Sequence, residues 1–139
     1  MRTHNDDDVR KRVPELMREV LDGVTRVHGA SYDLDYRWEN PVTYNDPKLV
    51  AETLPTIRRV MGEKKVISPP PQMGAEDFAY FAKEVPSFFY FVGVRNQEKG
   101  IVAAHHTPDF DLDEDGVVIG TKVMASVVLD YLERRAAGK

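Results

Sequence analysis

Residues 88–94 read FFYFVGV, an almost wholly apolar run that decides the expected fold. A strand that is apolar on both sides belongs in the middle of an α/β sheet, where helices cover both faces. Residues 32–38, YDLDYRW, instead alternate apolar and charged side chains. That alternation predicts a strand with one buried and one solvated face. The two patterns therefore predict two different architectures, joined near residues 39–45.

The regions around these two strands carry helical patterns. Apolar residues at spacings of three and four predict helices over about residues 9–24, 46–61, 75–83 and 115–135. Asp46 followed by Pro47 favours a helix start, and Gly62 favours a helix end. Pro14 lies inside the first stripe, so we expect that helix to start late or to kink there.

Composition excludes several classes of protein. The chain has 139 residues, 42% hydrophobic and 30% charged, as expected for one globular domain or two very small ones. Its net charge of −4 argues against a nucleic-acid partner. No apolar run approaches the ~20 residues of a membrane span, and we expect a cytoplasmic protein without a signal peptide. The absence of cysteine excludes disulfides and thiolate metal ligands within this chain.

Two adjacent histidines, His105 and His106, are the first candidates for chemistry. They follow a β-like run and precede Thr107-Pro108, whose stiff backbone suits a metal ligand. However, adjacent side chains diverge, and a catalytic zinc needs about three protein ligands. A metal ligand and an ordinary solvated loop histidine both remain open on spacing alone.

Three other features have a functional and a purely structural interpretation. Gly74 precedes an expected helix, so backbone N–H groups there either face an anion or simply form the turn. The acidic run over residues 109–115 fits a calcium loop poorly and predicts a cap for the last helix, with Asp113 or a neighbour as the cap. Arg2 is able to grip a carboxylate, but on its own it is a charge near a terminus.

Three segments together resemble a known family: MRTHNDDDVRKRV (1–13), QMGAEDFAYFAKEVPSFFYFVGV (72–94) and AHHTPDFDLDEDGVVIGTKV (104–123). They are similar to the C-terminal portion of the zinc-dependent N-acyl-amino-acid amidohydrolases, the metallopeptidase-like family that includes hippurate hydrolase. The resemblance implies an α/β fold. Residues 41–139 would be the end of a zinc-peptidase-like catalytic domain, and residues 1–40 the second half of an inserted α+β lid domain that mediates dimerisation.

The resemblance also implies roles for individual residues. His106 matches the family's last metal ligand, with His105 as the alternative if the loop shifts register. Met73 and Gly74 match the segment that lines the substrate pocket. Arg2 aligns with an arginine that contacts the substrate carboxylate. The family's general base and its other metal ligands match no residue of this chain, so we assign no catalytic residue here.

The function implied by the resemblance is hydrolysis of N-acyl amino acids by metal-activated water. The intact enzyme would hold two divalent ions, zinc or manganese. Met1 stands where relatives have Gly-Thr before the arginine, so we expect a fragment that begins at an internal methionine, binds no metal stably and is inactive alone. We expect a homo-oligomer with no nucleic-acid or membrane partner. The alternative is a non-catalytic module for self-association or for docking onto a partner.

Overall fold

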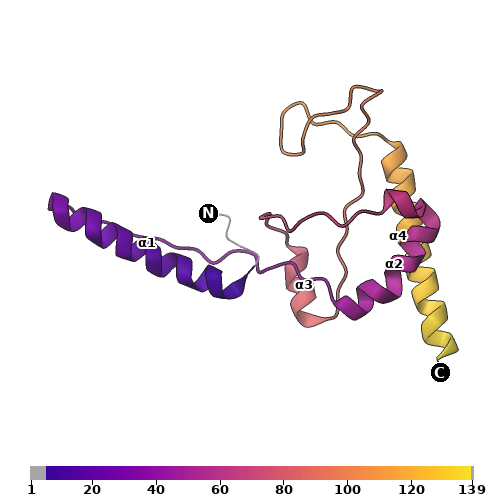
Figure 1. Cartoon of the computed structure of the whole chain (residues 1–139), viewed down its shortest axis with the longest axis horizontal. Helices are drawn as coiled ribbons and strands as arrows, with labels where there is room; N and C mark the ends of the chain where they lie inside the picture. The colour runs from indigo at the N-terminus through magenta and orange to yellow at the C-terminus, as the bar shows by residue number, and fades with distance from the viewer. Residues whose placement is uncertain (1–5, 139) are drawn as a thin grey trace. The chain divides into compact units, whose positions relative to one another are not determined.

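The computed structural model describes residues 6–138. Its helices are α1 (Asp7–His28), α2 (Pro47–Met61), the 3-10 turn η1 (Glu63–Lys65), α3 (Phe78–Glu84) and α4 (Asp115–Ala137) (Figure 1). The chain forms two compact units. One takes in the chain as far as Asn45 together with Pro69–Ser87, and the other takes in Asp46–Ser68 together with the chain from Phe88 onward.

In the first unit, α1 begins at its acidic cap and continues through a proline. The Asp6 side chain accepts hydrogen bonds from the backbone N–H groups of Asp8 (2.8 Å) and Val9 (3.1 Å), which satisfies two of the free donors at the helix start. The expected late start is therefore wrong. Pro14 is buried within the helix, and it leaves the carbonyl of Arg10 without its usual helical donor.

The segment after α1 turns at Gly29, whose φ of 58° is in the left-handed region, and runs back along the helix. The Tyr32 hydroxyl donates to the Asp22 carboxylate (2.8 Å) near one end of α1, and Arg10 donates to the Glu39 carbonyl (3.5 Å) near the other. The expected alternation is visible in the burial, since Leu34 is half-buried while the charged side chains beside it are exposed. Residues 32–38 are nevertheless not a strand.

In the second unit, α2 packs on α4 (Figure 1). Ile57 and Val123 are buried at 7% and 2% exposure. Thr56 is also buried, and its hydroxyl donates to the Asp130 carboxylate (2.5 Å), to which Arg59 also donates (2.8 Å). The buried hydroxyl is thus satisfied, as the helix interface requires. The expected bounds of α2 are confirmed: Asp46 caps its start, Pro47 is its first residue and Gly62 follows its end.

The apolar run over residues 88–94 lies against α4 by one side only. An added Cβ at Gly116 would lie 2.8 Å from Val94, one at Gly120 would lie 3.4 Å from Val92, and the Tyr90 hydroxyl is 3.9 Å from the Met124 sulfur. Every second residue of the run therefore meets every fourth residue of the helix. The two repeats match in length, because two extended residues span about 6.6 Å and four helical residues about 6 Å.

Only the helical part of the α/β expectation is present in the described residues. Within residues 6–138 there is no strand, and the β-type pairing is a single bridge between Asn96 and Ile101. Phe91 is 75% exposed, so residues 88–94 are not buried on both faces. The physical reason is that a strand needs a neighbouring strand to accept and donate its backbone hydrogen bonds, and α4 offers side-chain contacts alone.

Two further points concern the architecture. Contacts divide the chain at Asn45 and again at Ser68 and Ser87, which does not test the expected domain boundary after residue 40, and that boundary stays a prediction. In the described part of the chain, none of the helices combines the length and the apolar character that crossing a membrane requires.

Candidate functional site

His106 lies in an exposed loop of the second unit and has an unusual backbone. Its φ is 64°, which makes it the one non-glycine residue with positive φ among residues 6–138. The left-handed conformation costs a residue with a Cβ about 1 kcal/mol or more, although histidine adopts it more readily than most. Its ring meets the His105 ring edge-on, with centroids 4.6 Å apart. Both residues are exposed to solvent.

Short hydrogen bonds hold the loop around His106 in shape. The Thr107 hydroxyl donates to the Ala104 carbonyl (2.7 Å), and the Phe110 N–H donates to the Thr107 carbonyl (3.1 Å). Asp111 accepts from the Leu112 N–H (2.8 Å). These local bonds form two consecutive turns. His106, the residue with positive φ, directly precedes Thr107, whose side chain makes the first of these bonds.

The base of the same loop holds a buried carboxylate. Asp113 is 9% exposed and accepts from the Asn96 amide (2.5 Å) and the Lys99 ammonium (2.6 Å). The hydrogen bond from Asn96, followed by that from Lys99, holds the pKa of Asp113 below its usual range, and the bond to Asp113 raises the pKa of Lys99. Asp113 also accepts from the Asp115 N–H (3.3 Å) at the start of α4. Glu114 is the N-cap residue of α4 and makes no side-chain capping bond, so the expected capping is limited to the bond between Asp113 and the Asp115 N–H.

The Met73–Gly74 segment belongs to the first unit. Met73 is 56% exposed, and a Cβ added at Gly74 would meet no atom within 4 Å. The helix expected from residue 75 begins at Phe78 instead. Asp77 is the residue before the helix, and its carbonyl accepts the first helical hydrogen bond. Gly74 is therefore not at a helix start, and the anion-binding interpretation of that position is wrong. The exposed backbone at Gly74 remains accessible to a ligand.

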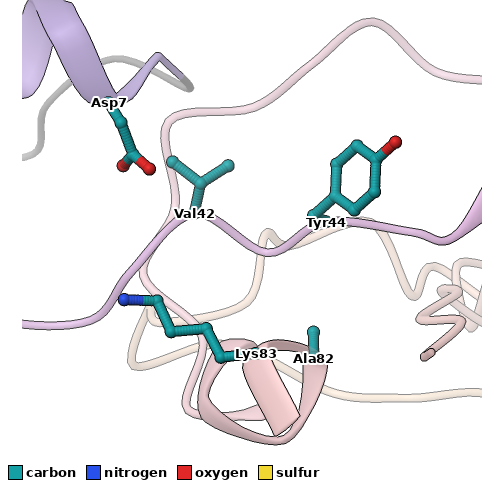
Figure 2. Close-up of a pocket in the computed structure, with 5 residues that line it drawn as sticks. All are labelled: Asp7, Val42, Tyr44, Ala82 and Lys83. Atoms are coloured by element: carbon teal, nitrogen blue, oxygen red, sulfur yellow. The ribbon is translucent and has the colours of Figure 1, made fainter. Parts of the chain in front are cut away.

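Arg2, the third substrate-contacting candidate, lies outside the described residues. The first unit does contain a cavity of about 290 Å³, lined by Asp7, Val42, Tyr44, Ala82 and Lys83 (Figure 2). The Asp7 and Lys83 side chains carry opposite charges, so the cavity offers no net attraction to an anionic substrate. No expected site residue lines it.

The resemblance implies a pair of metal ions, which need several His, Asp or Glu side chains as ligands. Residues 6–138 contain no group of three or more His, Asp or Glu side chains placed to hold a metal ion. His105 and His106 supply two imidazoles, and a catalytic zinc takes about three protein ligands. The described residues do not by themselves fit a catalytic metal centre. The same result leaves the acidic run at residues 109–115 without a calcium site.

Comparison with known proteins decides the family. The model of peptidase family M20/M25/M40 matches residues 4–130. The chain belongs to this peptidase family. It is 33% identical over 126 residues to the putative amidohydrolase YhaA of Bacillus subtilis, covering 91% of this chain and 32% of the relative. It is 41% identical over 93 residues to the IAA-amino acid hydrolase ILR1-like 6 of Arabidopsis thaliana, covering 67% of this chain and 19% of the relative.

A third relative is named for a different activity. Thermostable carboxypeptidase 2 of Saccharolobus solfataricus is 27% identical over 127 residues, covering 91% of this chain and 32% of the relative. No solved structure matches the chain. The chain spans about a third of the length of the curated M20/M25/M40 relatives YhaA and carboxypeptidase 2.

Sequence reasoning missed the cluster of Asn96, Lys99 and Asp113. It treated Asp113 as a helix cap alone and assigned no role to Asn96 or Lys99. One local signal was present, since Asn96 and Gly100 at the two ends of the NQEKG segment are residue types favoured in turns. The convergence of that turn on a carboxylate 14 residues beyond Lys99 is a tertiary feature without a sequence signature.

Proposed function

We propose that this chain is one part of an amidohydrolase that cleaves N-acyl amino acids at the amide bond. The observation that carries the proposal is the match to the M20/M25/M40 family over residues 4–130. The names of two relatives, a putative amidohydrolase and an IAA-amino acid hydrolase, favour linear amides of amino acids as substrates. Because the chain spans 32% of the first of these relatives and 19% of the second, it acts in this proposal together with residues that correspond to their remaining length.

In this proposal His106 is the ligand that the chain contributes to a metal centre completed elsewhere. Its exposed ring and its left-handed backbone support that role, since strained conformations concentrate at functional sites. The residues described do not by themselves hold the metal pair. The chain's own part is to present one imidazole in a fixed direction.

The substrate side of the proposal rests on Met73 and Gly74. An exposed methionine beside a residue without a side chain suits a pocket wall that must adapt to an acyl group, because methionine is flexible and polarisable. Arg2 is proposed to pair with the substrate carboxylate.

Complementation tests the proposed function. The purified chain is mixed with YhaA shortened by the third that it matches, with zinc or manganese present, and the release of amino acid from N-benzoylglycine and indole-acetyl amino acids is measured. We expect both parts to be inactive alone and the mixture to be active. Robust turnover by this chain alone would contradict its proposed dependence on the remaining part. Hydrolysis of dipeptides without hydrolysis of N-acyl amino acids would favour the carboxypeptidase activity.

A matched pair of variants sharpens the assay. His106→Asn removes the imidazole and keeps a side chain that tolerates positive φ, whereas His105→Asn makes the same change one residue earlier. The proposal expects the mixture with His106→Asn to be inactive and the mixture with His105→Asn to remain active. The reverse result would transfer the ligand role to His105.

One observation favours the second candidate, a non-catalytic association module. Large apolar side chains are exposed in both units, including Val27 at 80% and Phe91 at 75%. Exposed apolar surface of this kind marks an interaction site. Homo-oligomer formation is part of either proposal, so light scattering does not separate them. The complementation assay does, because an association module has no reason to restore hydrolysis.

A further inference from the structure

The loop that carries His106 begins at a tight turn. Asn96 and Ile101 exchange both backbone hydrogen bonds (2.9 and 2.8 Å), which closes residues 96–101 into a reverse turn. The Asn96 side-chain oxygen accepts from the N–H groups of Glu98 (3.0 Å) and Lys99 (3.2 Å) inside the turn, and Gly100 has a φ of 73° that favours glycine. The turn is therefore fixed from within, and the Asn96 amide nitrogen is left to point outward.

The same loop ends at Asp113, which is tied to that turn. Its N–H donates to the Val94 carbonyl (2.9 Å), and its carboxylate accepts from Asn96 and Lys99 at opposite oxygens. The Asp113 side chain is 11% exposed, whereas the Lys99 side chain is 53% exposed. Charge-assisted hydrogen bonds to a carboxylate are stronger than neutral ones, and more so away from water. Both ends of the loop are thus joined through the cluster of Asn96, Lys99 and Asp113.

Closing a loop in this way has a consequence for His106. Residues 102–112 lie between Ile101 and Asp113. The Ile101 backbone is hydrogen-bonded to Asn96, and the Asp113 N–H is hydrogen-bonded to the Val94 carbonyl. Fixing the ends removes much of the conformational freedom of the residues between them. A single left-handed residue in the middle of the loop is retained because the surrounding contacts determine its backbone.

We propose that Asn96, Lys99 and Asp113 form a positioning clamp that fixes the direction in which the loop presents the His106 imidazole. The inference rests on the proposed function in so far as the imidazole is a metal ligand. The clamp residues contact neither substrate nor metal in this proposal and act through the loop. Metal ligands need such outer support, because a ligand that must hold one ring orientation is weakened when its backbone moves.

The clamp is tested by NMR on the full chain, without metal or substrate. Asp113→Asn keeps the shape of the side chain but removes its charge and one acceptor oxygen. Asp111→Asn makes the identical change at an exposed position two residues earlier, where the asparagine Oδ1 is still able to accept the hydrogen bond from the Leu112 N–H. For Asp113→Asn we expect backbone order parameters of residues 102–112 to fall from about 0.85 to below about 0.6. We also expect the His106 ring resonances to move toward unstructured values, with helix content by circular dichroism unchanged. Asp111→Asn should alter neither.

Variants at Lys99 decide the case if Asp113→Asn fails to fold. Lys99→Met removes the ammonium from a half-exposed stem and should loosen the loop in the same way. Lys99→Arg restores a donor and should return the order parameters and the His106 ring signals, a rescue that general destabilisation does not predict. An ordered loop with unchanged His106 signals in Lys99→Met overturns the clamp.

The outcome is independent of the proposed function. Loop order is measured on the isolated chain, so a clamp that behaves as expected beside an inactive complementation mixture refutes the hydrolase and leaves the clamp. An active mixture in which Lys99→Met and the unaltered chain hydrolyse with the same kcat and KM refutes the positioning role and leaves the hydrolase.

Discussion

Two glycines of α4 test whether the apolar run over residues 88–94 lies on the helix as described. A Cβ added at Gly116 would meet Val94 Cγ1 at 2.8 Å and the Gly93 carbonyl oxygen at 3.5 Å. A Cβ added at Gly120, one helical turn later, would meet Val92 Cγ2 at 3.4 Å, an ordinary van der Waals contact. Gly116→Ala and Gly120→Ala are therefore the same chemical change with opposite packing consequences.

The expected magnitudes follow from two opposing contributions. Alanine stabilises a helix interior by about 1 kcal/mol relative to glycine, and by less at Gly116, the second residue of α4. Overpacking costs about 1–3 kcal/mol, and the branched Val94 side chain has few rotamers with which to move aside. We expect Gly116→Ala to lower the free energy of unfolding by about 1–2 kcal/mol and Gly120→Ala to raise it by about 1 kcal/mol.

Thermal unfolding followed by circular dichroism at 222 nm measures both variants, with a urea titration to check that the m-value is unchanged. For a chain of this size 1 kcal/mol corresponds to about 4 °C, so the two midpoints should move in opposite directions. Equal stabilisation by both substitutions would refute the reasoning, since it would mean that Val94 does not lie against the first turn of α4.

Three further outcomes are expected. Pro55 is exposed inside α2 and removes a helical hydrogen bond, so Pro55→Ala should raise the free energy of unfolding by about 1–3 kcal/mol in a urea titration; a decrease would contradict this reasoning. The pKa of Asp130 is lowered by hydrogen bonds from Thr56 and then Arg59, so its contribution is complete above the unfolded pKa near 4 and is lost as the pH falls below it. Asp130→Asn should flatten the acid limb of the stability profile, and an unchanged limb would contradict this. His106→Asn should leave the thermal midpoint within about 2 °C, since asparagine tolerates positive φ; a larger fall would assign the imidazole a role in packing.

The helices were the part of the fold that the sequence predicted well. The start and end of α2 follow from Asp46, Pro47 and Gly62, because capping is a local interaction between neighbours in the chain. The expected late start of α1 at Pro14 was wrong, and the reason is again a local capping interaction. The Asp6 side chain accepts the capping hydrogen bonds that begin the helix at Asp7, seven residues before Pro14, and the helix continues through the proline.

The strands could not be predicted in the same way, because a strand is defined by its partner. The apolar pattern of residues 88–94 was interpreted as burial on both faces, yet the described chain covers the side that Val92 and Val94 present to α4 and leaves Phe91 exposed. An apolar sequence pattern shows which sides of a segment are suited to burial. It does not show whether the surface that buries them lies in the same stretch of chain. The run retains the composition of a central strand and lacks a pairing neighbour in residues 6–138.

The candidate site shows the same division between local and tertiary information. His106 was selected by its place before Thr107 and Pro108, and neither its left-handed φ nor its dependence on Asp113 follows from those neighbours. The left-handed conformation is a cost that the loop must offset, and the bonds of the turns at Thr107 and Phe110 are local to the loop. The buried carboxylate at the loop's base supplies that direction. Loop order therefore tests the anchoring of His106, and the complementation assay tests whether the anchored imidazole is a metal ligand.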